Sequence, residues 1–465
     1  MWKIDVEALG VVDAVKYSYM QLSEDIDPVG NIFMIFAHDL VVHFTGMLIQ
    51  REAKSAYEHK VCFPHVNKDY ALSPFSIGPT IDEVERHRSS LKAWIRSLPL
   101  SRTAVGDALP LSSGADRVAA KWINLFGGRK APVQVFLPRR NEQIEALYEL
   151  IANLSSVYGF SGIDDIWENW YQYVIGNTST KQSVIRENGL LVGTRNNLQN
   201  RKLAANFLQQ GKHVVAITHG EVANSVMDEP PFGYSERTLC STLIDYGEFD
   251  QSGQFNKPWI KPQLTLSRGG ALAALVHRPS DRIVLPDRGR ARILYIPTTY
   301  HGNDLYGPFH VYEDDLYRQW QCALFKAIPG LTFKAHPKSL GGPLEGVPID
   351  SRRLEDCIPE YDVLVFDYFA TGAMLALVSD KPVIYLDIGL RNLQKDFILD
   401  LKRRCEYVKI EFSDSEKWDL TNALSQCWEV SAERTNEGMA RYVFCDPERF
   451  SWKAVFSAVN AGTAP

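Results

Sequence analysis

The sequence lacks several features that would assign its class directly. Its 465 residues contain no low-complexity tract and no repeat at the periods typical of solenoid proteins. No stretch reaches the roughly 20 uninterrupted apolar residues of a membrane-spanning helix, because His38 and Asp39 interrupt the apolar run 31–44. The first ten residues also lack the basic start and long apolar core of a signal peptide. These absences favour a globular protein of the cytoplasm.

Paired cysteines and an excess of positive charge are also missing. The seven cysteines are odd in number and form no C-x-x-C pair, which argues for reduced thiols and against a zinc site. A formal net charge of -6 gives no footprint for sequence-independent binding of nucleic acid. The remaining composition, with 45% hydrophobic and 23% charged residues, is that of an ordinary globular protein long enough for two or three domains.

Apolar runs and helical patterns alternate through the second part of the chain. A polar stretch at 278–292, rich in Arg, Asp and Pro, precedes them and is typical of a linker. Beyond it we expect four strands and two helices, because alternating strands and helices build a parallel sheet. The expected strands are 292–297, 331–335, 363–366 and 383–386; one expected helix is 314–327, and a second contains the apolar segment 373–378.

The first part of the chain shows the same alternation less clearly. It contains a strand-like run at 133–138, a helical pattern at 198–210 that ends at Gly211, and a second strand-like run at 213–218. Two further helices are expected at 81–98 and 141–154, and a terminal helix at 450–459. The prediction is therefore an α/β protein with two Rossmann-like domains facing a central cleft, divided as 1–285 and 290–445, with the segment 446–465 packing back on the first domain.

A turn between two strands is the strongest local signal. The strand 363–366 ends in Asp367, and small residues then lead into an apolar helix. Thr371 is the predicted N-cap of that helix, and Gly372 would let a ligand approach the backbone. Free N–H groups and a partial positive charge at a helix start suit a phosphate. An ordinary turn that binds nothing is the alternative reading of this segment alone.

Three more residues follow a neighbouring strand. The run 331–335 leads directly into His336, Pro337 and Lys338, and Pro337 holds the residue before it in an extended conformation. Thr298 follows the strand 292–297 in the same way. Since the carboxyl ends of parallel strands meet at one edge of a sheet, we expect these residues and the Thr371 turn to line one nucleotide-binding crevice.

A cluster of carboxylates follows the strand 213–218 of the first domain. That strand leads into His219 and Gly220, and three carboxylates, Glu221, Asp228 and Glu229, lie within the next nine residues. Carboxylates on a surface loop are commonly only solvated, which is the alternative. Their position after a strand end, opposite the expected phosphate site, favours a catalytic role.

These motifs resemble a known family. The segments ILYIPTTY, FKAHP and VFDYFATGAMLALVSDKPVIYLD resemble the nucleotide-binding half of bacterial GT-B glycosyltransferases that use CMP- or CDP-activated donors for surface polysaccharide. His336–Pro337 is similar to the His-Pro motif of sialyltransferases and Kdo transferases, which binds the CMP leaving group. The loop from His219 resembles that of retaining β-Kdo transferases, in which a carboxylate acts on the anomeric carbon.

The resemblance varies along the chain. It covers 294–387 well, 213–247 moderately and 1–130 hardly at all. Where the sialyltransferase pattern has two serines near the phosphate, this chain has Thr371–Gly372, so the donor contacts differ in detail.

The resemblance implies a glycosyltransferase that moves a 2-keto sugar acid, either Kdo or a nonulosonic acid such as pseudaminic or sialic acid, from a CMP-activated donor. The implied acceptor is a lipid-linked oligosaccharide of O-antigen, capsule or lipopolysaccharide, reached from the cytoplasm or the inner face of the cytoplasmic membrane. We expect no cofactor and no metal, since no Asp-x-Asp motif stands at the end of a predicted strand. Asp228 as a nucleophile would give retention, which the resemblance to retaining β-Kdo transferases implies, and as a base it would give inversion.

Three alternatives remain open. The turn before residues 380–384 also resembles that of glycerol-phosphate polymerases of teichoic acid synthesis, which favours a CDP-glycerol or CDP-ribitol donor. A UDP-sugar epimerase of the same two-domain fold would also place carboxylates and a histidine in the cleft. A non-catalytic scaffold of a polysaccharide assembly complex would keep the fold and need none of the cleft residues.

Overall fold

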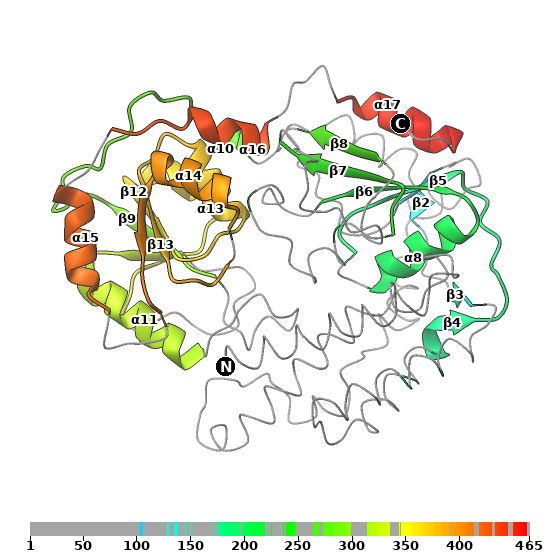
Figure 1. Cartoon of the computed structure of the whole chain (residues 1–465), viewed down its shortest axis with the longest axis horizontal. Helices are drawn as coiled ribbons and strands as arrows, with labels where there is room; N and C mark the ends of the chain where they lie inside the picture. The colour runs from blue at the N-terminus through cyan, green and yellow to red at the C-terminus, as the bar shows by residue number, and fades with distance from the viewer. Residues whose placement is uncertain are drawn as a thin grey trace.

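The computed structural model describes most of the second part of the chain and selected segments of the first (Figure 1). The longer described stretches are 175–195, 198–218, 239–247, 264–268, 273–298, 314–334, 346–391, 393–412, 418–429, 433–444 and 450–462. Residues 103–105, 128–129, 134–137, 145, 149, 171, 225, 236 and 344 complete the set.

The second half of the chain builds a six-stranded sheet in which every neighbouring pair is parallel. Its strand order is β11-β10-β9-β12-β13-β14, which is the 3-2-1-4-5-6 order of a Rossmann fold. The strands are β9 (Ile293–Ile296), β10 (Thr332–Lys334), β11 (Ile349–Asp350), β12 (Val363–Phe366), β13 (Val383–Asp387) and β14 (Glu406–Lys409). Because β9 leads to β10 on one side and β12 lies on its other side, the strand order reverses between β9 and β12.

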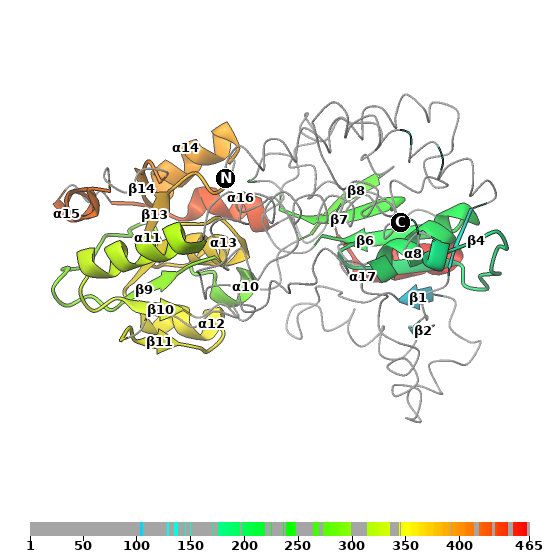
Figure 2. The ribbon, with the colours of Figure 1, turned by 90° about the horizontal axis from the view of Figure 1, so that it is seen from below.

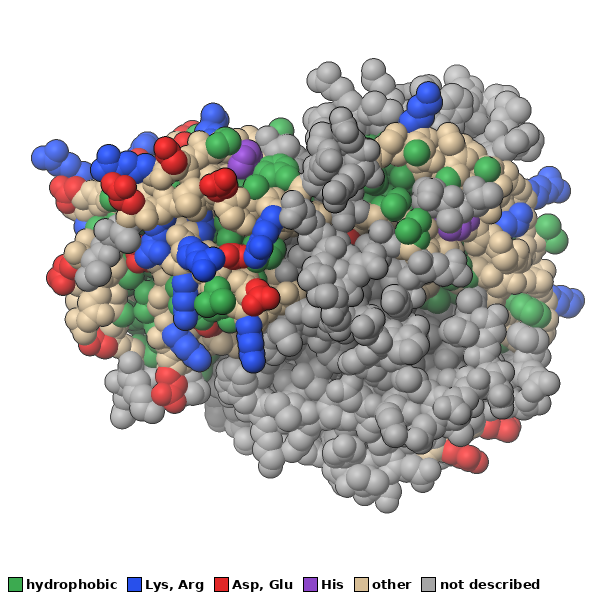
Figure 3. Space-filling model, turned by 45° about the horizontal axis from the view of Figure 1, so that its top comes forward, with side chains coloured by type: hydrophobic (Ala, Val, Ile, Leu, Met, Phe, Trp, Pro, Cys, Tyr) green, Lys and Arg blue, Asp and Glu red, His purple; other side chains and the backbone are tan. Residues whose placement is uncertain are grey.

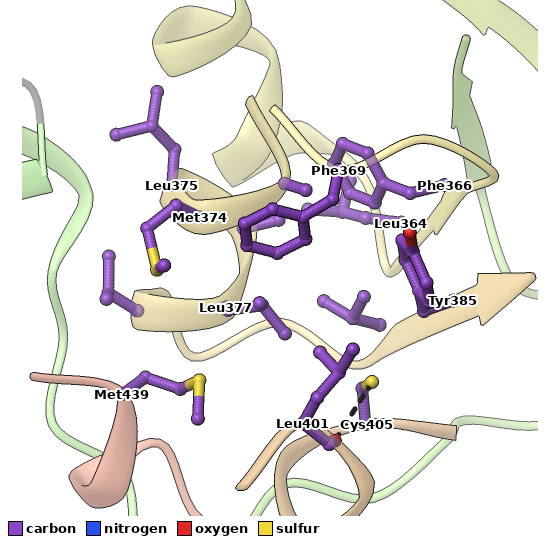
Figure 4. Close-up of a cluster of buried hydrophobic side chains, with 14 of the residues drawn as sticks. Leu364, Phe366, Phe369, Met374, Leu375, Leu377, Tyr385, Leu401, Cys405 and Met439 are labelled. Atoms are coloured by element: carbon purple, nitrogen blue, oxygen red, sulfur yellow. Dashed lines mark hydrogen bonds between the residues drawn. The ribbon is translucent and has the colours of Figure 1, made fainter. Parts of the chain in front are cut away.

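Helices cover both faces of this second sheet, as its near-continuous apolar strands require. On one face α11 (Asp314–Ala327) and α15 (Leu420–Glu429) pack against side chains such as Tyr295 and Val365. On the other face α13 (Thr371–Val378) and α14 (Lys395–Arg404) enclose Leu364 and Phe366. Six consecutive residues of α13 are buried, and Figure 4 shows Met374 and Leu377 of this helix among the core side chains.

Short helices complete this half. The turns α12 (Leu354–Cys357) and η5 (Ile358–Glu360) precede β12, while η7 (Glu437–Met439) and α16 (Ala440–Val443) follow the sheet in sequence. The four-residue helix α10 (Ala273–Val276) packs on α13, so that Ala273 and Val276 belong to the same hydrophobic cluster as Leu364.

The first half builds a second, separate parallel sheet of six strands with the order β2-β1-β5-β6-β7-β8. Its strands are β1 (Thr103–Val105), β2 (Gly128–Arg129), β5 (Gly189–Val192), β6 (His213–Ile217), β7 (Thr242–Tyr246) and β8 (Leu264–Arg268). A short parallel pair, β3 (Val135–Phe136) and β4 (Thr178–Ser179), lies outside it. The strand order reverses between β1 and β5, which is the flavodoxin-like arrangement.

Two helices pack on the middle of the first sheet. Helix α8 (Leu198–Gln209) contacts β5 and β6 and ends before Gly211, whose φ of 65° is the left-handed conformation expected of a C′ glycine. Helix α17 (Trp452–Ala461) comes from the far end of the chain. It buries Val455, Phe456 and Val459 against β5, β6 and β7.

The described parts of the two halves lie side by side in both ribbon views (Figures 1 and 2). One contact between them is a backbone hydrogen bond of 3.0 Å from the N–H of Gln394 to the carbonyl of Ser225. A second is the close approach of Gly247, after β7, to the backbone of Tyr442 in α16.

Several sequence predictions are confirmed. The chain is an α/β protein with two Rossmann-like parallel sheets, as expected for the GT-B class. Helix α11 and strand β12 have the predicted bounds, and α17 begins two residues later than expected because Ser451 is its N-cap. The predicted helix 81–98 lies outside the described residues, as does most of 141–154. The domain limits at 285, 290 and 446 stay predictions.

Candidate functional site

The reversal of strand order in the second sheet defines one location on its carboxyl edge. In open parallel sheets ligands bind outside the carboxyl ends of the strands where the order reverses. Here those strands are β9 and β12, and they lead to Thr298 and to the start of α13 respectively. Strand β10 pairs with β9 on its other side and ends at Lys334, two residues before His336. The predicted nucleotide-binding segments therefore follow three adjacent strands.

The start of α13 differs in one respect from the prediction. The N-cap is Ala370, with φ of -144° and ψ of -175°, and Thr371 is the first helical residue. The N-cap role assigned to Thr371 is therefore wrong, because Ala370 has the extended backbone of an N-cap and Thr371 is already helical. The first bonds inside the helix join the N–H groups of Ala373 and Met374 to the Ala370 carbonyl, at 2.9 and 3.2 Å. The helix start itself, with its partial positive charge, lies where it was expected.

Gly372 owes its identity to packing on its side-chain side. A Cβ atom at this position would lie 3.0 Å from Leu354 Cδ2, 3.9 Å from Phe366 Cε1 and 4.0 Å from Ile296 Cγ2. These atoms belong to the apolar core between α13 and the sheet. The missing side chain thus lets α13 lie close to α12 and β12, which is a different reason from the ligand approach that the sequence indicated.

A buried carboxylate lies directly after β12. Asp367 is 1% exposed, and three donors from two other elements surround it. Tyr295 OH donates to its Oδ2 at 2.5 Å, Trp320 Nε1 donates to Oδ2 at 2.9 Å, and Tyr317 OH lies 3.0 Å from both carboxylate oxygens. Burial raises the pKa of Asp367 to about 6, although these hydrogen bonds oppose the shift. In turn, burial and the nearby carboxylate raise the pKa values of Tyr295 and Tyr317 well above their ordinary value.

Sequence reasoning missed this cluster. Asp367 was visible as the last residue of an apolar run, but its partners lie 47 to 72 positions away in sequence. The only local signal was an acidic residue inside an otherwise apolar strand and turn.

A polar cluster also follows β5 in the first half, close to the reversal of strand order there. Arg195 is fully buried and donates through Nη1 to the Gly193 carbonyl at 2.9 Å and through Nη2 to the Glu236 carbonyl. Thr194 Oγ1 donates to Glu236 Oε1 at 2.5 Å. Asn200 Nδ2, in α8, donates to the Thr194 carbonyl at 2.7 Å. No role for Thr194 or Arg195 was predicted from the sequence.

The proposed catalytic residues lie outside the described residues. These are His219, Glu221, Asp228 and Glu229, together with His336, Pro337 and Lys338 of the nucleotide site. Their roles therefore stay predictions. Of the predicted site residues, the structure describes Thr298, Thr371 and Gly372, and it brings them to the ends of the adjacent strands β9 and β12.

The described residues offer neither a metal site nor a membrane-spanning helix. Within them, no group of three or more His, Cys, Asp or Glu side chains is placed to hold a metal ion. None of the helices in the described ranges is both long and apolar enough to cross a membrane. On the face seen in Figure 3, Lys and Arg side chains of the described second half lie among Asp and Glu side chains.

The chain shows only limited similarity to known proteins. No family model and no curated protein sequence matches the chain. Among solved structures, a glycotransferase of kitacinnamycin is 11% identical, with 80% of this chain and 91% of that chain covered and a TM-score of 0.34. The spinosyn forosaminyltransferase is 12% identical, covering 78% and 96% with a TM-score of 0.32. The spinosyn rhamnosyltransferase, in complex with spinosyn aglycone, is 14% identical, covering 78% and 97% with a TM-score of 0.30. These scores are too low to assign a function, and the description of the fold rests on the two sheets themselves.

Proposed function

We propose that the protein is a GT-B glycosyltransferase that transfers a 2-keto sugar acid from a CMP-activated donor to a growing surface glycan. The observation that carries this proposal is the position of the predicted donor residues. Thr298, the segment 336–338 and the start of α13 follow β9, β10 and β12, three neighbouring strands of a sheet with Rossmann order. A nucleotide placed there would lie across the reversal point between β9 and β12.

The chemistry of the donor fits these residue types. When CMP leaves a 2-keto sugar acid, negative charge develops on its phosphate. The side chains of His336 and Lys338 and the N-terminus of α13 could offset that charge. The acceptor would bind on the first half, where the loop 219–229 follows β6 and supplies the carboxylates, and the two halves would face each other across a cleft.

The nucleotide class is tested first by binding. Thermal shifts with CMP, CDP and UDP nucleotides distinguish the candidate functions, because a ligand that binds only the folded state raises its stability. We expect stabilisation by CMP and CMP-sugars. Stabilisation by CDP-glycerol alone would indicate a polyol-phosphate transferase, and by UDP-sugars alone an epimerase. If none of them stabilised the protein, the result would favour the non-catalytic scaffold.

The His336→Ala variant then tests the site. Loss of a charge-assisted contact to phosphate should weaken CMP binding by about tenfold to a hundredfold. Lys326→Ala is the matched control, because Lys326 is an exposed cation on α11. Unchanged CMP affinity in His336→Ala would reject the assigned role.

The catalytic carboxylate is tested by three isosteric variants, Asp228→Asn, Glu229→Gln and Glu221→Gln. Each removes a charge with little change of shape, so transfer should fall steeply only where that charge is needed. If Asp228 is the nucleophile, wild-type enzyme given CMP-Kdo should carry the mass of one sugar on the peptide that contains it. If it is a base, no adduct forms and activity is still lost. Full activity in all three variants would exclude this loop from the mechanism.

A further inference from the structure

Asp367 is an unusual group to find in the core of a sheet. It belongs to the face of the second sheet that also buries Tyr295, Tyr317 and Trp320, and all four side chains are at most 1% exposed. Removing a carboxylate from water is costly unless strong hydrogen bonds compensate. Well-packed apolar residues would often serve stability at least as well. Packing alone therefore does not explain why a carboxylate occupies this buried position.

Its hydrogen bonds reach the edge where the nucleotide is proposed to bind. Tyr317 OH lies 3.0 Å from both oxygens of Asp367, and it also accepts the backbone N–H of Thr298 at 3.2 Å. Each tyrosine hydroxyl has one proton and two lone pairs. Because the Tyr317 proton points to the carboxylate, its lone pairs can accept from Thr298. Three groups are thus linked in series: a carboxylate after β12, a hydroxyl on α11 and an amide after β9.

We propose that Asp367 is a positioning residue which, through Tyr317, holds the backbone of Thr298 in place for the donor nucleotide. This inference rests on the proposed function. The two strands joined by the chain of bonds are the pair on either side of the reversal point. Donation of the Tyr317 proton to the Asp367 carboxylate polarises the hydroxyl, which makes its oxygen a better acceptor for the Thr298 amide. Asp367 itself touches no substrate in this scheme.

Two tyrosine variants separate positioning from simple stabilisation. Tyr317→Phe and Tyr295→Phe each remove one buried hydroxyl from the same carboxylate and keep the aromatic ring. The Thr298 N–H donates to Tyr317, whereas Tyr295 contacts the Tyr317 hydroxyl at 3.2 Å and receives no bond from Thr298. Both variants should lose stability, because each removes a donor to the buried carboxylate. Only Tyr317→Phe should also weaken CMP binding, by about threefold to tenfold, which corresponds to one ordinary hydrogen bond.

Hydrogen exchange provides a readout that does not depend on any ligand. In the free protein, peptides covering 293–298 should exchange faster in Tyr317→Phe than in Tyr295→Phe, because only the first frees the Thr298 amide. Equal exchange in the two variants, or equal CMP affinity, would overturn the inference. If wild-type protein binds no nucleotide, the proposed function fails, and the exchange comparison alone decides whether this chain of bonds holds Thr298.

Discussion

The two halves of the molecule fix the loops after their strands with buried charges of opposite sign. In the first half, Arg195 lies after β5, and its guanidinium binds the carbonyls of Gly193 and of Glu236, which lies between β6 and β7. In the second half, Asp367 lies after β12, and its carboxylate accepts from the hydroxyls of Tyr295 in β9 and Tyr317 in α11. A guanidinium donates hydrogen bonds and a carboxylate accepts them, and burial raises the pKa of Asp367 to about 6. The edge of the second sheet should therefore respond to pH as Asp367 titrates.

The largest expected effect concerns a buried cation in the second half. Arg404 donates to the carbonyls of Ala376, Leu377, Ser379 and Lys381, at distances from 2.6 to 3.2 Å, and so completes the end of α13. Arg404→Ala leaves these carbonyls without that donor and creates a cavity, so unfolding free energy measured in urea should fall by about 4 kcal/mol.

Arg403→Ala is the control for that measurement, because the Arg403 side chain is 79% exposed and should contribute less than about 0.5 kcal/mol. Hydrogen exchange should rise first in peptides of α13 and β13, while peptides of β5 and β6 keep their protection. An equal rise in both sheets would show that the halves unfold as one unit and would contradict a separate stabilisation of each half.

The next effect concerns the contact between the halves. Gly247 has a φ of 75°, and a Cβ atom there would lie 2.4 Å from the backbone of Tyr442. Gly247→Ala should cost about 3 kcal/mol, from left-handed strain together with overlap of backbone atoms that cannot move aside separately.

Gly211→Ala is its matched control, since Gly211 has a φ of 65° and nothing within 4 Å of the position of the added Cβ. That variant should cost only the conformational strain of about 1 kcal/mol. Equal losses in the two variants, measured by denaturant unfolding, would mean that the approach of Gly247 to Tyr442 contributes nothing.

The pH response of the second half should be measurable in Asp367→Asn. Because the pKa of Asp367 is about 6 in the folded protein and ordinarily 3.8, the folded state binds the proton more tightly. Stability from this group is therefore present below about pH 4 and lost as pH rises through 6, by about 3 kcal/mol in total. The neighbouring Tyr295, Tyr317 and Tyr385 have raised pKa values and stay neutral over this range.

The measurement is the difference in unfolding free energy between wild type and Asp367→Asn from pH 4.5 to 7.5. The wild type should lose stability relative to the variant as pH rises to about 6, and the difference should then level off. A difference that is constant with pH would contradict the assignment of this titration to Asp367.

The smallest effect is expected at Gly372. The atom nearest to an added Cβ is the end of the Leu354 side chain, which can move, and alanine is favoured over glycine in a helix. Gly372→Ala should thus change stability by less than about 1 kcal/mol and leave CMP affinity unchanged. A marked loss of affinity with little change in stability would support the prediction that glycine is needed for close approach of a ligand.

Much of the second half could be predicted because its elements are marked by local pattern. Helix α11 and strand β12 match their predicted bounds, since amphipathic spacing and an unbroken apolar run are visible within a few residues. In the first half the apolar runs and helical spacing were less distinct. Strands β5 and β7 were not predicted. Strand β5 begins with Gly189, and β7 begins with Thr242 and carries Asp245, polar residues that are buried by their neighbours.

The sequence predicted where the site lies but not the hydrogen bonds that build it. The residues that follow the predicted strands indicated a crevice. The order of the strands in the sheet depends on contacts between distant segments, so no short segment could predict it. The link from Asp367 through Tyr317 to Thr298 joins three elements up to 69 positions apart, and only packing brings them together. The N-cap at Ala370 shows a similar limit, since Thr371 was the better residue by preference and backbone geometry decided otherwise.

Helix α17 also sets the order in which the protein can fold during synthesis. The first sheet is made early, but the side chains of Val455, Phe456 and Val459 that cover β5, β6 and β7 leave the ribosome only after β14 and α15 have been made. The second sheet, by contrast, has its helices within a continuous stretch from α10 to α16. The second sheet can therefore complete its core before the first sheet does. Until α17 is made, the face of β5, β6 and β7 that α17 covers stays exposed and can bind a chaperone.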